Sequence, residues 1–529
     1  MSTPEALPER YRAWQLFGAG FENIGENDAP SELEMRQPEA HEILCRSDAL
    51  GLCLSDMKII KQGNQHARLR GRDLASDPTV LGHECACTVV AVGDDWKDKF
   101  QPGQRFVVQA DIYFKGVNFA FGYMIPGGLA EYFYLDERAL AGDEGCYLLP
   151  VKDETGYSES ALSEPWACVE MSYRIEERFT PGDGRVLIVT DRDIPVSYEG
   201  SVHVPRDLEG LGEGETFDDI LLWDATPELV EKLGHRLNKK GAMFIFGEPA
   251  AEGDANLDIG RIHYEDIRFF GGGDTPDEIQ AKNERMDLQP GGAALFIGAG
   301  GPMGQMHVQR AVEKQDGPAL VVVTDLDKGR LEHIENRFGA MAKARGAELK
   351  CYCPKDFPSA GDLNTELGGL VEDGYDDICI LAPVAALVTD AMPMAADGAI
   401  INVFAGVIVG STAPVPIQDL CRGVKIMGSS GSRISDMLTV LNKVESNELS
   451  TNLSVAAIGG LLAAKEGLAA LRDAVYPGKT IIYPQCPEVP LMSLEEVPEK
   501  LPELADKLGP KGEWTKAAED ALIAHYGRK

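Results

Sequence analysis

Two short clusters near the start of the chain carry side chains that could do chemistry. Cys53 begins the run Cys-Leu-Ser-Asp, and His83 and Glu84 follow a glycine further along the chain. Thiolate, imidazole and carboxylate groups are the ligands that a catalytic zinc uses when one coordination position stays open for water or substrate. Single cysteines, however, are usually small core residues. These clusters alone therefore leave both a metal site and ordinary packing open.

A further carboxylate, Glu164, stands in the run Ser-Glu-Pro just before a predicted helix. It falls at the end of the β-rich part of the chain, ahead of the segments that predict nucleotide binding. Its position adds a second acidic group to the candidate site.

A glycine-rich turn in the middle of the chain lies between two apolar runs, Ala293–Ile297 and Ala319–Val323. The order predicts strand, turn, helix and strand. Such a turn lets backbone N–H groups meet a pyrophosphate, and a carboxylate at the tip of the second strand can bind a ribose. The spacing GxGxxxG is irregular, so a plain tight turn is the alternative. The predicted cofactor-binding residues of this stretch are Gly298, Gly300, Gly301, Pro302, Met303, Gly304 and Asp325.

Length and charge limit the class of protein. A chain of 529 residues with 44% hydrophobic residues predicts two or three globular domains. The net charge of −35 argues against nucleic acid or an anionic membrane as a partner. No apolar run approaches the roughly 20 residues that span a bilayer, and the first residues do not resemble a secretion signal. With eleven scattered cysteines, we expect a cytoplasmic protein without a disulfide framework.

The elements repeat along the chain. Three segments that begin at Phe217, Gly241 and Ile267 resemble segments that lie 157 or 158 residues later. A register that holds through three strands indicates an internal duplication. The first copy lacks a glycine-rich turn after its first strand, so we predict a shortened, non-binding repeat with a structural role. An active second nucleotide site is the rival interpretation. The truncated sheet would cover its edge against the second copy or another subunit.

The predicted architecture is α/β. It combines a β-rich catalytic domain over 1–180, a truncated Rossmann-like repeat over 181–288 and a complete nucleotide-binding Rossmann domain over 289–476. A return strand and a helical extension occupy 477–529. Helices are predicted over 435–448, 454–464 and 468–475, and an amphipathic helix over 513–526.

The ordered set of motifs resembles the zinc-dependent medium-chain dehydrogenase/reductase family of the alcohol dehydrogenase superfamily. The likeness is to its sorbitol dehydrogenase and L-sorbose-1-phosphate reductase-like branch. The motifs are GLCLSD at 51–56, GHE at 82–84, GGLAEY at 127–132, SEPWACVE at 163–170 and the glycine-rich turn. The resemblance implies a GroES-like fold for the catalytic domain.

By this resemblance, Cys53, His83 and Glu84 surround a catalytic zinc, and Glu164 lies by the metal directly or through water. Ser55 matches the hydroxyl that passes the substrate proton outward. Many relatives bind a structural zinc with four closely spaced cysteines, but 111–127 contains no cysteine here. We therefore predict one catalytic zinc and no structural zinc.

Asp325 favours NAD over NADP, because a carboxylate binds two ribose hydroxyls and repels a 2′-phosphate. Lys328 and Arg330 could soften that preference. Phe404, Ala405 and Gly406 follow a predicted strand and are candidate nicotinamide contacts, although ordinary packing explains them equally well.

The predicted function is zinc-dependent hydride transfer between NAD(H) and a polyol, a ketose or a sugar phosphate. A substrate phosphate would need cationic contacts, and Arg68, Arg70 and Arg72 form a basic run that could supply them. The alternative interpretation of this run is a solvent-exposed surface. The alternative is a catalytically inactive nucleotide-binding or assembly protein. By analogy with relatives, we expect a homo-oligomer, either a dimer or a tetramer.

Overall fold

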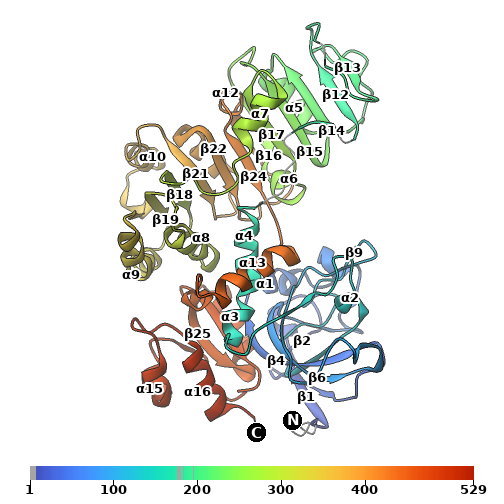
Figure 1. Cartoon of the computed structure of the whole chain (residues 1–529), viewed down its shortest axis with the longest axis vertical. Helices are drawn as coiled ribbons and strands as arrows, with labels where there is room; N and C mark the ends of the chain where they lie inside the picture. The colour runs from blue at the N-terminus through green and yellow to red at the C-terminus, as the bar shows by residue number, and fades with distance from the viewer. Residues whose placement is uncertain (1–6, 175–179, 183, 195, 529) are drawn as a thin grey trace. The chain divides into compact units, whose positions relative to one another are not determined.

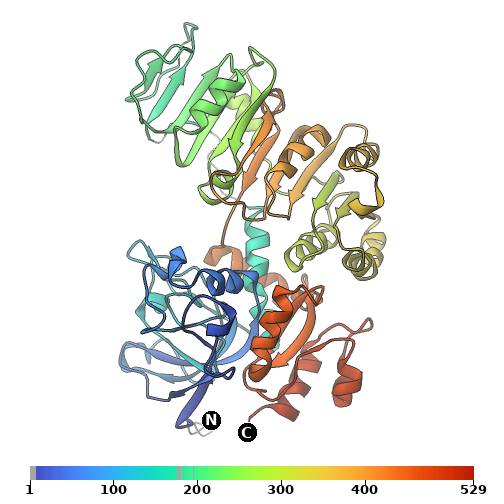
Figure 2. The ribbon, with the colours of Figure 1, turned by 180° about the vertical axis from the view of Figure 1, so that it is seen from behind.

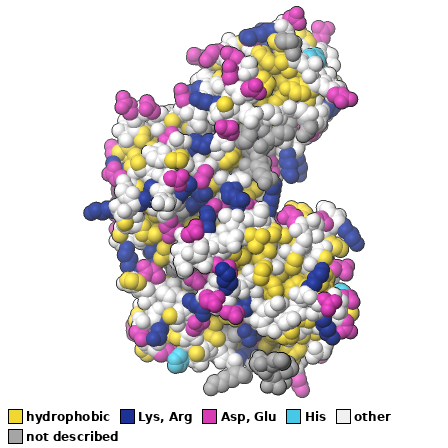
Figure 3. Space-filling view, viewed as in Figure 1, with side chains coloured by type: hydrophobic (Ala, Val, Ile, Leu, Met, Phe, Trp, Pro, Cys, Tyr) yellow, Lys and Arg dark blue, Asp and Glu magenta, His cyan; other side chains and the backbone are white. Residues whose placement is uncertain are grey.

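The computed structural model describes residues 7–174, 180–182, 184–194 and 196–528. Internal contacts divide the chain into two compact units, one of residues 1–170 with 431–529 and the other of residues 171–430 (Figures 1 and 2). No described helix is long and apolar enough to cross a membrane. Acidic and basic side chains lie scattered over the visible face and do not form one large patch (Figure 3).

The first unit is built on an eight-stranded, mostly antiparallel sheet in the order β11-β7-β6-β4-β26-β25-β27, with β10 beside β4. Both faces pack apolar side chains, so the sheet holds the core of this unit. Its strands are β4 (Ile43–Gly51), β6 (Glu84–Val92), β7 (Arg105–Val108), β10 (Tyr132–Leu135), β11 (Leu148–Pro150), β25 (Val455–Gly460), β26 (Lys479–Tyr483) and β27 (Met492–Ser493).

Short strands and helices surround this sheet. The outer strands are β1 (Arg10–Ala13), β2 (Gln15–Leu16), β3 (Ser31–Glu34), β5 (Thr79–Val80), β8 (Tyr113–Phe114) and β9 (Val117–Asn118). The helices are α1 (Leu54–Gln62), α2 (Glu137–Leu140), α3 (Tyr157–Ala161), α4 (Ser163–Met171), α13 (Ile434–Glu445), α14 (Ala464–Arg472), α15 (Val497–Lys500) and α16 (Lys516–Tyr526).

One predicted helix is wrong. Residues 454–464 were expected to be helical, but Val455–Gly460 forms β25, which pairs in parallel with β26. Every residue of this strand is buried, so its sequence carries neither a period of two nor one of 3.6, and an apolar run of this kind does not distinguish a strand from a helix. Because β25 joins this sheet, residues 431–476 lie with the first unit, whereas the sequence analysis placed them with the nucleotide-binding domain.

The second unit contains a six-stranded parallel sheet in the order β20-β19-β18-β21-β22-β24. Numbered along the chain, this order is 3-2-1-4-5-6, that of a doubly wound dinucleotide-binding fold. The strands are β18 (Ala293–Ile297), β19 (Leu320–Thr324), β20 (Glu348–Tyr352), β21 (Tyr375–Ile380), β22 (Ala395–Val403) and β24 (Lys425–Gly428). The helices are α8 (Pro302–Glu313), α9 (Lys328–Arg345), α10 (Ala360–Gly368), α11 (Ala386–Ala391) and α12 (Ile417–Cys421).

A second parallel sheet of the same unit has the order β13-β12-β14-β15-β17. When its strands are numbered by their equivalents in the complete fold, this order is 2-1-4-5-6. The third strand of the complete fold has no equivalent in this sheet. The mixed α/β architecture with two Rossmann-like sheets is thereby confirmed, while the predicted boundary at 288 stays a prediction. The strands are β12 (Val186–Val189), β13 (Val202–Val204), β14 (Phe217–Trp223), β15 (Leu237–Phe246) and β17 (Arg268–Gly273), and the helices are α5 (Pro227–Gly234), α6 (Ile259–Tyr264) and α7 (Pro276–Asn283).

Candidate active site

The first unit brings Cys53 together with the adjacent residues His83 and Glu84. Candidate ligand atoms of Cys53, His83 and Glu84 all lie within 4.8 Å of one another. Cys53 caps the start of α1 directly after β4, and Glu84 is the first residue of β6. Because Gly51 pairs with Glu84 in the β4–β6 ladder, the register of two strands sets this geometry.

Asp56 supports both halves of this group. Its carboxylate accepts the Cys53 N–H at 3.1 Å and the Gly82 N–H at 3.2 Å, and one of its oxygens lies 3.4 Å from His83 Nδ1. Burial disfavours a charged imidazole, but Asp56 and Cys53 nevertheless raise the pKa of His83 well above its usual value. A single buried carboxylate thus holds the backbone at Cys53 and Gly82 and lies beside the imidazole.

Glu84 forms a buried ion pair with Lys479 on β26. Burial opposes the charge of the lysine, but the Glu84 carboxylate outweighs it and raises the pKa of Lys479. Lys479 is not among the site residues predicted from the sequence. The signal in the sequence is a lysine at the start of the mainly apolar run Lys-Thr-Ile-Ile-Tyr. In the structure this lysine is only 3% exposed.

The donor chemistry of this group fits a zinc ion. His83 Nδ1 and Glu84 Oε2 are buried, and neither makes a hydrogen bond, since the Asp56 carboxylate 3.4 Å from His83 Nδ1 is a charge neighbour only. Buried polar atoms without partners are costly unless another group satisfies them. Sulfur, nitrogen and oxygen donors in one cluster suit a catalytic zinc.

Glu164 and Ser55 lie near this group but are not part of it. Glu164 stands in the first turn of α4, and burial raises the pKa of its carboxyl to about 7, against the opposing charge of His83. Within the described residues, the set that could hold a metal excludes it. Ser55 is half-buried, two residues after Cys53 on α1. The roles of both residues stay predictions.

The three arginines of the basic run have different surroundings. Arg68 pairs with Asp111 at 3.0 Å and lies over the ring of Tyr123, whose centroid is 6.0 Å from that of His83. Arg70 is exposed, and Arg72 donates to the carboxylate of Asp77 and to backbone carbonyls. Arg68 is therefore the arginine of this run that borders the site.

The C-terminal extension supports the helix that leads to Glu164. The Glu519 carboxylate on α16 accepts the N–H groups of Tyr157 and Ser158 at the start of α3, at 2.5 and 2.7 Å. It also accepts the hydroxyl of Tyr483, which ends β26, at 2.9 Å. One buried carboxylate thus ties residues 516–526 to α3, which precedes the helix of Glu164, and to β26, which carries Lys479.

In the second unit, the glycine-rich turn is hydrogen-bonded to the predicted ribose carboxylate, Asp325. The Gly300 N–H donates to Asp325 Oδ2 at 2.7 Å, and a Cβ on Gly300 would lie 2.5 Å from Asp325 Cγ. Gly301 precedes α8, which begins at Pro302 and continues through Met303, and a Cβ on Gly304 would lie 2.5 Å from the backbone of Ala299. The backbone N–H groups at the start of α8 can therefore approach an anion closely.

Large exposed apolar side chains follow the carboxyl ends of three strands of this sheet. They are Leu326 after β19 (60% exposed), Val384 after β21 (49%) and Ile408 after β22 (80%). A flat, partly apolar dinucleotide binds along this edge in doubly wound sheets. Phe404, Ala405 and Gly406 are half-buried on the same loop as Ile408.

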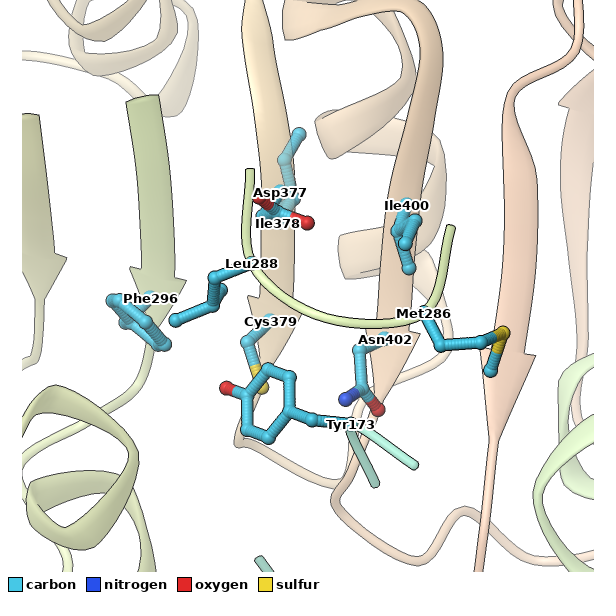
Figure 4. Close-up of a pocket in the computed structure, with 9 residues that line it drawn as sticks. All are labelled: Tyr173, Met286, Leu288, Phe296, Asp377, Ile378, Cys379, Ile400 and Asn402. Carbon is cyan, nitrogen blue, oxygen red and sulfur yellow. The ribbon is translucent and has the colours of Figure 1, made fainter. Parts of the chain in front are cut away.

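An interior cavity beside β21 and β22 is not the cofactor site. Its lining includes Tyr173, Cys379 and Asn402 (Figure 4). Its volume is about 10 Å³, which holds about one water molecule. Nearby, the Tyr173 hydroxyl lies 2.7 Å from Nδ1 of His307, whose pKa burial lowers to about 3. This region is packed interior that supports Phe404, whose ring centroid lies 4.3 Å from that of His307.

The chain is similar to known proteins along most of its length. Residues 39–142 match the family described as alcohol dehydrogenase GroES-like domain. L-sorbose 1-phosphate reductase from Klebsiella pneumoniae is 26% identical over 489 residues, which cover 92% of each chain. Mannitol-1-phosphate 5-dehydrogenase from Aliivibrio fischeri is 24% identical over 506 residues, 93% of this chain and 94% of that protein. The crystal structure of 2R,3R-butanediol dehydrogenase from Bacillus subtilis shares the fold with a TM-score of 0.54 at 15% identity, over 90% of this chain and 99% of that chain.

A GroES-like unit combined with a doubly wound sheet defines the class of alcohol dehydrogenases. The chain contains the alcohol dehydrogenase GroES-like domain and resembles a reductase and a dehydrogenase over more than nine tenths of its length; it is an oxidoreductase. These similarities agree with the alcohol dehydrogenase resemblance that the motifs predicted.

Proposed function

We propose that the chain is a zinc-dependent dehydrogenase that transfers hydride between NAD(H) and a polyol or ketose, free or phosphorylated. The observation that carries the proposal is the group of Cys53, His83 and Glu84, because its ligand atoms lie together and two of them, His83 Nδ1 and Glu84 Oε2, are buried without a hydrogen-bond partner. The names of two relatives, which refer to phosphorylated sugars and sugar alcohols, support the substrate class. One zinc is proposed, since a single such group occurs among the described residues.

The chain's own residues would bind and orient the reactants. When bound, zinc supplies a Lewis acid for the substrate oxygen, and the nicotinamide carries the hydride. Cys53, His83 and Glu84 would hold the metal, with Glu164 beside it directly or through water. Ser55 would take the hydroxyl proton outward. The turn at Gly298–Gly304 would bind the pyrophosphate through backbone N–H groups.

Asp325 is proposed to select NAD. Asp325→Asn keeps an oxygen that can accept the Gly300 N–H but removes the charge that repels a 2′-phosphate. The ratio of kcat/KM for NADP to that for NAD should then rise about tenfold, a change of about 1.4 kcal/mol. Steady-state kinetics with both cofactors measure it. Asp316→Asn, in the turn before β19, is the control, and an unchanged ratio in Asp325→Asn would remove Asp325 from cofactor selection.

A substrate panel tests the proposed function itself. Metal-replete protein should oxidise NADH with a ketose or a ketose phosphate, which absorbance at 340 nm records. If a phosphorylated substrate is preferred, Arg68→Ala should raise its KM about tenfold, equivalent to one lost charge-assisted contact. Arg70→Ala, from the same basic run, should leave KM unchanged. Absence of turnover across the panel in zinc-loaded protein would contradict the proposed function and favour an inactive nucleotide-binding protein.

A further inference from the structure

The two repeats of the second unit meet through a local two-fold arrangement. β16 (Asp254–Asp258) of the first repeat pairs antiparallel with β23 (Thr412–Pro416) of the second. Equivalent positions of the repeats lie about 158 residues apart, as Phe217 and Tyr375 do. With that spacing, Asn256 is equivalent to Pro414, and Asn256 pairs with Pro414 at the centre of the ladder. Each strand therefore pairs with its own counterpart, which is the property of an isologous interface between two subunits.

The sheet edges repeat the same reciprocity. Gly271 on β17 and Gly428 on β24 are equivalent positions of the two repeats. A Cβ on Gly271 would clash with the backbone of Leu420 on α12, and a Cβ on Gly428 would lie 3.0 Å from His263 Cα on α6. The helices α6 and α12 are equivalent elements of the two repeats. Each edge strand therefore packs against the equivalent helix of the other repeat. β17 and β24 lie side by side in both views (Figures 1 and 2).

One face of this ladder is apolar and buried, and the other face is exposed. Ala255 faces Val415 and Leu257 faces Ala413 across the ladder, and none of the four is more than 2% exposed. All four belong to a single hydrophobic cluster that contains residues of both repeats. The buried face of this ladder resembles the apolar centre of a permanent dimer interface more than a transient contact.

The same contact reaches the predicted nicotinamide loop of the complete repeat. The His263 ring lies with Nδ1 3.0 Å from the carbonyl oxygen of Val403, the last residue of β22. Tyr264 packs on Gly406 so closely that a Cβ there would clash with the tyrosine hydroxyl. A Cβ on Gly260 would lie 2.5 Å from the backbone of Ile408. α6 of the truncated repeat thus supports the loop that follows β22.

The described residues of the truncated repeat lack the features that bind a dinucleotide in the complete repeat. In the described residues between β12 and β13 there is no helix, so no helix N-terminus faces the position of a pyrophosphate. At the carboxyl ends of its strands, Arg192 pairs with Asp224 and Arg206 pairs with Asp191. These charges neutralise one another where a cofactor would bind.

We propose that the truncated repeat is an internal partner subunit. It occupies the β24 edge of the cofactor-binding sheet as a second copy would, and Tyr264 positions the loop 404–409 for the nicotinamide end of the cofactor. The second part rests on the proposed function.

The first test concerns Tyr264, whose side chain is 43% exposed and can be shortened without opening the core. Tyr264→Ala should raise the dissociation constant of NADH about tenfold, while Tyr264→Phe, which keeps the ring against Gly406, should stay within about twofold. Glu228→Ala, at an exposed position of the same repeat, is the control. Fluorescence titration with NADH measures all four proteins, and zinc content should not change. Equal affinity of wild type and Tyr264→Ala would overturn the positioning role.

The second test does not depend on the cofactor. In hydrogen exchange of the full chain without NADH, the amides that bond across the ladder between 254–258 and 412–416 should exchange slowly and at matching rates, because neither strand can open alone. Fast exchange in one segment beside slow exchange in the other would overturn the internal interface. If wild type shows slow, matched exchange but does not bind NADH, the proposed function is contradicted and the internal interface is not.

Discussion

Replacing Cys53 by alanine is expected to abolish zinc binding and turnover together. The remaining donors, His83 and Glu84, are too few to hold a catalytic zinc with three protein ligands. A Lewis acid is worth several kcal/mol of transition-state stabilisation, so kcat should fall by roughly 1000-fold or more.

Metal analysis of the purified variant gives the result directly. Zinc should drop from about one ion per chain to near zero, as for a site that has lost one of its protein ligands. Cys146→Ala, a half-buried cysteine of the same unit, is the control and should keep both zinc and activity. A Cys53→Ala protein with full zinc content would show that the metal lies elsewhere.

Lys479→Met should destabilise the chain strongly, because it leaves the Glu84 carboxylate buried without its partner. Breaking one side of a buried ion pair costs about 3–5 kcal/mol. For domains of this size, each kcal/mol lowers Tm by about 2–4 °C, so a fall of about 10 °C is expected. The displaced carboxylate should also weaken zinc binding, since Glu84 belongs to the ligand group.

A double variant separates the ion pair from the packing of the lysine stem. Lys479→Met combined with Glu84→Gln removes both charges and should recover most of the lost Tm, but not the zinc affinity. Lys516→Met, which breaks an exposed pair with Asp520, should cost less than about 1 kcal/mol. A similar Tm for Lys479→Met and Lys516→Met in calorimetry would rule out a structural role for the buried pair.

The sequence by itself determined the features that depend on local pattern. The alternation of strand, glycine-rich turn and helix predicted β18, α8 and β19, because backbone geometry and burial impose their periods over a few residues. The matched register of two segment sets predicted the duplication. The order of the motifs predicted the family and named Cys53, His83 and Glu84 as one group.

Only the tertiary structure decided which distant groups are partners. Lys479 lies 395 residues from Glu84 along the chain, and Glu519 lies 361 residues from Ser158. The helix predicted over 454–464 proved to begin with a strand because a neighbouring strand, β26, was available to complete its hydrogen bonds. The pairing of β16 with β23 likewise follows from packing of the whole unit. Local patterns specify which surface of an element is apolar, but the group that covers that surface is selected by the fold as a whole.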